Sequence, residues 1–132
     1  MTTQFRRLQV GGFLIDPSPS EVAKFVLTSS DVGAFSPHEK VALVKAMEEG
    51  CSKFGRWLTG SDAGIGDDLV GRTTNTNPLQ DAAARLLEST LTNPQESDAM
   101  VSELGVPWIR ARLRFIASAR LSFIIRNALS RV

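Results

Sequence analysis

Five segments of the chain have a proline at their start, and in the first three of them apolar residues recur at the spacing of one α-helical face. Four of these prolines follow serine or asparagine. The side-chain oxygen of such a residue can accept a hydrogen bond from a backbone N–H of the first turn, where proline needs none. The pattern predicts helices over residues 19–30, 37–58, 78–91, 94–104 and 105–132. The residues predicted to face inward are Val22, Phe25, Val26, Val44, Met47, Cys51, Phe54, Leu58, Ala82, Ala83, Leu86 and Leu87.

Two stretches lack the helical pattern. Residues 1–16 carry short apolar groups on both sides of Gly11-Gly12, which indicates an extended arm or a small hairpin. Residues 59–76 carry four glycines, and 18 residues are long for a connection. This indicates an active, binding or assembly loop, or a short irregular sheet in which Leu69 and Val70 pair with the N-terminal strands. The sequence therefore predicts one all-α domain over residues 1–132. We expect an antiparallel four-helix bundle with an extra short helix, short N-terminal extended segments and one long irregular loop.

The segment 105–132 is unlike the other predicted helices. It carries six arginines and no aspartate, glutamate or lysine, and neither the arginines nor the large apolar residues collect on one side of a helix. Because this segment carries +6 and the whole chain only +1, the first 104 residues carry −5. One interpretation is a core helix whose arginines reach water or pair with acids elsewhere. The other is a helix that offers its arginines to a neighbouring chain or to phosphate.

The residues that could carry catalysis are few. Cys51 is the only cysteine and His38 the only histidine, which excludes an internal disulfide and a cysteine or histidine metal cluster. Asp62, Asp67 and Asp68 could bind a divalent cation, because such cations prefer oxygen ligands. They are weak candidates because they lie in a glycine-rich stretch. We therefore expect no enzyme, no metal and no cofactor. No apolar run reaches transmembrane length, and the N-terminus lacks a signal peptide, which predicts a soluble, intracellular protein with no membrane partner.

Several short motifs occur in a particular order along the chain. They are Thr2-Thr3-Gln4-Phe5, Asp16-Pro17, the spacing from Phe35 to Trp57, and Arg72, Asn75 and Asn77-Pro78-Leu79 before an alanine-containing helix. This layout resembles the coat proteins of rod-shaped plant viruses of the tobacco mosaic type. The resemblance implies a four-helix bundle that stacks into discs or a helical rod, with RNA held between turns. That family presents arginines after its third helix, whereas residues 92–98 have none here, so RNA contacts would fall to the last helix.

From these observations we expect a self-assembling structural protein, a capsid or nucleocapsid-like subunit that forms rings or helical filaments and can bind single-stranded RNA. The resemblance would place it in a virion. The expected RNA-binding residues are Arg110, Arg112, Arg114 and Arg120, and the expected assembly residues are Trp108, Phe115, Phe123 and Arg126. The alternative is a small monomeric or dimeric helical adaptor that binds other proteins and no nucleic acid.

Overall fold

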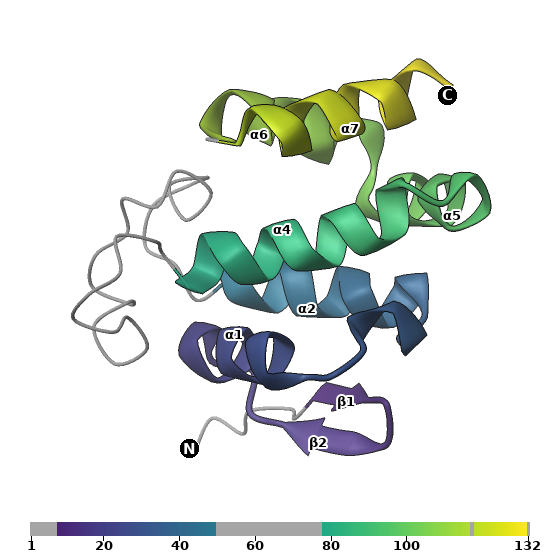
Figure 1. Ribbon diagram of the computed structural model, residues 1–132. Helices are drawn as coiled ribbons and strands as arrows, with labels where there is room; N and C mark the ends of the chain where they lie inside the picture. The colour runs from purple at the N-terminus through teal and green to yellow at the C-terminus, as the bar shows by residue number, and fades with distance from the viewer. Residues whose placement is uncertain (1–7, 50–77, 117, 132) are drawn as a thin grey trace, which may run out of the picture.

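The computed structural model describes residues 8–49, 78–116 and 118–131, which fold mainly as α-helices (Figure 1). The helical class that the sequence predicts is confirmed. The elements are β1 (Leu8–Val10), β2 (Phe13–Ile15), α1 (Pro19–Thr28), α2 (Pro37–Glu49), α4 (Pro78–Leu91), α5 (Pro94–Leu104), α6 (Val106–Arg112) and α7 (Ala119–Ser130). Short 3-10 helices cover Val32–Ala34 and Leu113–Phe115. The predicted continuation of the second helix to Leu58 and the loop 59–76 lie outside the described residues.

The predicted capping residues Ser18, Ser36 and Asn93 begin their helices, although Ser18 does so with a different partner, and Asn77 lies outside the described residues. At the start of α2, the backbone N–H of Glu39 donates to the Ser36 hydroxyl (3.2 Å), and the N–H of Ser36 donates to the Glu39 carboxylate (2.9 Å). This is the reciprocal capping box that the sequence predicts. At the start of α1, the Ser18 hydroxyl accepts from Glu21 (3.4 Å), but the Ser18 N–H donates to Asp16 (3.3 Å) instead of Glu21.

The N-terminal segment forms a small hairpin, one of the two structures that its sequence allows. Strands β1 and β2 pair antiparallel, with Val10 opposite Phe13 across Gly11-Gly12. Both glycines have positive φ (57° and 86°), as a two-residue hairpin turn requires. The Gly11 N–H donates to Glu39 of α2 (3.0 Å), and this bond is the main reason why the pKa of Glu39 is lowered. A single carboxylate thus joins the hairpin to the start of α2.

Helix α4 is the centre of the core. It packs against α1, α2, α5 and α7, and its predicted inward residues are all buried, with Leu86 fully enclosed. Arg85 of the same helix donates to the carbonyl oxygens of Val26, Leu27 and Ser29 at 2.9–3.1 Å, which satisfies the free end of α1. The hairpin and α1 lie at one end of the molecule, α6 and α7 lie at the other, and α2 and α4 lie between them (Figure 1).

The predicted single helix over residues 105–132 is instead two helices, α6 and α7. The chain is extended at Ile116 (φ −79°, ψ 116°), and the Ser118 hydroxyl then caps α7 by accepting from the Leu121 N–H at 3.1 Å. The break lets apolar residues that would point in different directions on one helix reach the same core, where Ile109 and Ile125 are buried. One subunit therefore covers most of the apolar surface that the sequence analysis left without a partner.

Replacing Ser118 with alanine should lower the free energy of unfolding by about 1 kcal/mol, because α7 loses its N-terminal cap. The measurement is urea unfolding followed by circular dichroism. Ser122→Ala, one turn further along α7, is the matched control and should have a smaller effect. If both substitutions lower the free energy of unfolding equally, the Ser118 cap does not stabilise the start of α7.

Candidate functional site

The six C-terminal arginines divide into two groups by their partners. Three of them form ion pairs inside the subunit: Arg112 with Glu48, Arg120 with Glu88 (3.3 Å), and Arg131 with Asp98 (3.8 Å). Within the described part of the chain, the other three, Arg110, Arg114 and Arg126, have no acidic partner, and all are exposed. The first interpretation, pairing with acids elsewhere, thus holds for three of the six arginines, and the other three are exposed.

Arg112, one of the residues expected to contact RNA, makes its contacts inside the subunit. Arg112 is 8% exposed. Its guanidinium donates to both carboxylate oxygens of Glu48, and the Nη2–Oε1 distance is 2.6 Å. It also donates to the backbone oxygen of Trp108 (2.8 Å) and lies 4.0 Å from the centre of that indole ring. Arg112 thus ties α6 to α2 and is not available to phosphate.

Arg110 and Arg126 lie together on an open groove between α6 and α7. The groove has a volume of about 450 Å³ and is also lined by Leu113, Leu129 and Ser130. Guanidinium groups suit phosphate because their planar fork donates two parallel hydrogen bonds. No pattern within one segment indicates that these two arginines meet, since the reversal of the chain between α6 and α7 brings them together.

The exposed side of α7 carries a second feature, an aromatic ring among arginines. Phe123 is 64% exposed, and Arg120 and Arg126 lie three residues before and after it on the same side of the helix. Arg126 donates only weakly to Ser122 (3.4 Å). A ring flanked by guanidinium groups is typical of surfaces that bind unpaired bases and also of protein interfaces.

The other expected site residues are placed as follows. Trp108 and Phe115, expected at an assembly interface, are half-buried against the core of their own subunit. The Arg114 guanidinium lies 5.0 Å from the Phe115 ring and is otherwise exposed. Arg120 is exposed despite its ion pair, and such a pair contributes little to stability. The exposed residues of the expected sets are therefore Arg110, Arg114, Arg120, Phe123 and Arg126.

A second exposed surface lies at the hairpin end. Phe13 is 63% exposed and lies edge-on to Phe25 (6.1 Å between ring centres), which stacks on Phe35 (5.6 Å). These three rings, together with Asp31 and the end of α1, line a hollow of about 320 Å³, which we call the aromatic hollow. Leu14, on the other face of the hairpin, is 64% exposed. The sequence analysis named none of these residues as a site.

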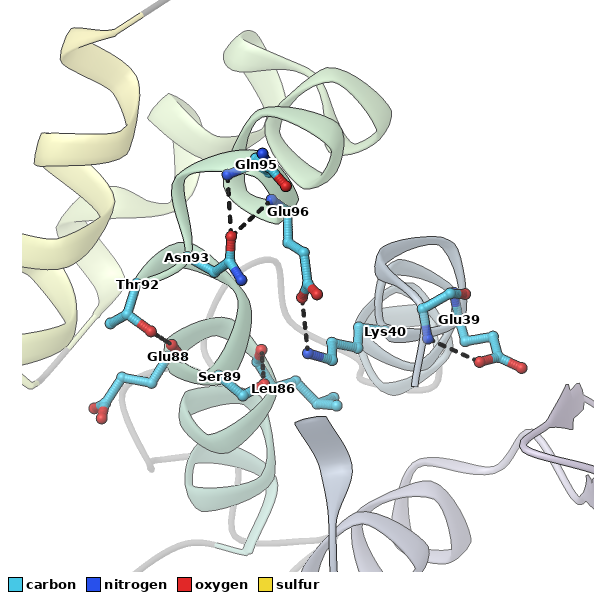
Figure 2. A network of polar contacts seen from close by, with 10 residues as sticks. Glu39, Lys40, Leu86, Glu88, Ser89, Thr92, Asn93, Gln95 and Glu96 are labelled. Atoms are coloured by element: carbon cyan, nitrogen blue, oxygen red, sulfur yellow. Dashed lines mark hydrogen bonds and ion pairs between the residues drawn. The ribbon is translucent and has the colours of Figure 1, made fainter. Parts of the chain in front are cut away.

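A buried lysine lies where α2, α4 and α5 meet (Figure 2). The Lys40 side chain is fully enclosed, and its amino nitrogen is 3.8 Å from the Glu96 carboxylate. Burial lowers the pKa of Lys40, and Glu96 partly opposes this effect. Glu96 is held by its place at the start of α5, where its N–H donates to Asn93 (3.4 Å). Position 40 precedes Val44 by one turn on the predicted apolar stripe, so the pattern itself places this lysine inward.

Other candidates for chemistry are weak. A small cavity of about 20 Å³, lined by residues of α4, α5, α6 and α7, has almost entirely apolar walls and room for about one water molecule. His38 is an exposed residue, as expected, and lies 2.5 Å from Glu103. Among the described residues, no group of His, Cys, Asp and Glu could hold a metal ion, and no helix is long and apolar enough to cross a membrane. Asp62, Asp67 and Asp68 lie outside the described residues.

Comparison with known protein families, with curated proteins and with solved structures finds no match to this chain.

Proposed function

We propose that this protein is a self-associating structural subunit, built on an antiparallel helical bundle, that packs into rings or helical filaments. The observation that carries the proposal is the presence of exposed aromatic residues at opposite ends of the molecule, Phe13 on the hairpin and Phe123 on α7 (Figure 1). Contacts between unlike surfaces at two ends repeat from copy to copy and produce rings or open filaments. The resemblance to rod-shaped virus coat proteins supports the same proposal and extends it to a capsid or nucleocapsid-like role in a virion.

The competing function is a small monomeric or dimeric adaptor. It is favoured by the break between α6 and α7, because the subunit itself covers most of the apolar surface of the C-terminal segment. Association would then rest on the few exposed aromatic and arginine side chains and would depend on ionic strength. The two functions predict different masses in solution.

Sedimentation velocity and light scattering across pH and ionic strength test the proposal. At about 100 µM, a contact of roughly −6 to −8 kcal/mol would be largely populated, so we expect species well above the 14.3 kDa of one chain. A single 14.3 kDa species under all conditions contradicts the proposal and leaves the adaptor function. A dimer that grows no further at any concentration contradicts rings and filaments in the same way.

The second candidate function is the binding of single-stranded RNA, and the groove between α6 and α7 supports it. Arg110 and Arg126 line this groove without acidic partners in the described part of the chain, and Phe123 offers a ring for base stacking beside them. Arg114, in the 3-10 helix Leu113–Phe115, and the exposed Arg120 of α7 add to this basic surface. Arg112 does not belong to this set, because its guanidinium is buried against Glu48.

Replacing Arg110 and Arg126 together with alanine should weaken binding of single-stranded RNA by about tenfold at low salt. The slope of log K against log salt should become less steep by about 0.7 for each arginine removed, because fewer counterions are displaced. Fluorescence anisotropy with a labelled oligonucleotide at two salt concentrations measures both quantities. Arg131→Ala, an exposed arginine that pairs with Asp98, is the matched control and should change either quantity less. No binding by the unaltered protein at low salt would remove this candidate function.

A further inference from the structure

The exposed side of α7 and the aromatic hollow are complementary in chemistry. On α7, Phe123 is exposed and has Arg126 one turn away. The hollow has walls of three phenylalanine rings and carries Asp31 on its border. Aromatic rings prefer edge-on or offset contacts, and Phe13 and Phe25 already make an edge-on contact at the hollow.

The charges on the two surfaces have opposite signs, and neither Asp31 nor Arg126 forms an ion pair within the described part of the subunit. Both residues are exposed. An acid at the border of an aromatic hollow disfavours phosphate, which argues against nucleic acid as its occupant. It favours an aromatic side chain that is accompanied by a cation.

One copy cannot fill its own hollow with its own Phe123. The hairpin, which forms one wall of the hollow, and α7 lie at opposite ends of the molecule, with α2 and α4 between them (Figure 1). Phe123 can therefore fill this hollow only when it comes from a second copy. A contact of this kind uses different surfaces on the two partners, so each copy can bind one neighbour at each end.

We infer that Phe123 of one copy docks into the aromatic hollow of a second copy, and that Arg126 of the first pairs with Asp31 of the second. The inference rests on the proposed self-association and names the two surfaces that make it. The occupant of the hollow is thus α7 of another copy of this chain.

A charge exchange tests this contact. Asp31→Arg and Arg126→Asp should each raise the apparent Kd for association at least about tenfold, because like charges then face each other. An equimolar mixture of the two variants should restore association, because the altered hollow meets the altered helix with opposite charges and the other contact is unaltered. Arg114→Asp makes the same charge change in the 3-10 helix Leu113–Phe115, outside α7, and should leave association within about threefold of the unaltered protein. Sedimentation velocity measures association, and circular dichroism checks that each variant folds.

Phe123→Ala supplies a measurement that does not depend on the charge variants. Removing this exposed ring should also raise the apparent Kd at least about tenfold, as expected of an aromatic anchor. Association that survives both Phe123→Ala and Arg126→Asp, or that the mixture does not restore, overturns the inference while the proposed self-association stands. If the unaltered protein does not associate at all, the proposed function fails first, and the inference fails with it. Asp31→Arg should leave RNA binding unreduced, and a loss there would assign this surface to RNA instead.

Discussion

Replacing Arg112 with alanine should lower the free energy of unfolding by about 3–5 kcal/mol, because it leaves Glu48 partly buried without this partner. The loss is large because domains of this size are stabilised by only about 5–15 kcal/mol in total. The same substitution removes a hydrogen bond to the Trp108 carbonyl and a cation–π contact with its ring. Urea unfolding at neutral pH measures the change, and the variant should unfold at a markedly lower midpoint.

Two further variants separate the ion pair from simple loss of the side chain. Arg110→Ala removes an exposed arginine from the same helix and should change stability by no more than about 0.5 kcal/mol. Arg112→Met combined with Glu48→Leu removes both charges and keeps apolar packing, so it should recover much of the loss. If Arg112→Ala were as mild as Arg110→Ala, the proposed tie between α2 and α6 would be wrong, and Arg112 would again be a candidate for phosphate binding.

The second large effect is expected at the buried lysine, and its sign depends on which partner is changed. Glu96→Gln leaves Lys40 enclosed without its ion pair and should cost about 2 kcal/mol, less than a fully buried pair would because Glu96 is half-exposed. Lys40→Met removes the buried charge and fills a similar volume, so it should stabilise the protein by roughly 1–2 kcal/mol. If Glu96→Gln and Lys40→Met both lowered the free energy of unfolding, this account of Lys40 would be contradicted.

Lys40 also predicts a dependence of stability on pH. Its folded-state pKa is lowered from the ordinary value of 10.5, mainly by burial, so the unfolded chain binds a proton that the folded protein lacks between these two pKa values. Stability contributed by this group therefore increases as pH rises through that alkaline window and is least below it. Urea unfolding across the window should show this slope in the unaltered protein, and Lys40→Met should lack the part that Lys40 contributes.

The sequence determined the local structure well because the relevant interactions span only a few residues. Ser36 and Glu39 form the predicted capping box, and the ends of α4 and α5 coincide with the predicted Pro78–Leu91 and Pro94–Leu104. Gly105 closes α5 with a positive φ of 96°. The hydrogen bonds of a helix's first turn and its apolar period both depend only on residues close together in the sequence. This is why the helical class could be predicted.

The tertiary structure decided which arginines are available and where the C-terminal segment breaks. The sequence contains nothing between Phe115 and Ser118 that must end a helix, yet the 3-10 helix after α6 ends at Phe115 and α7 begins at Ala119, and Ile109 and Ile125 are both buried in the core. This break sets Arg110 beside Arg126, and the same packing buries Arg112 against Glu48, 64 residues away. Contacts between residues so far apart in the sequence depend on how all the helices pack together. The periodicity within one segment does not indicate them.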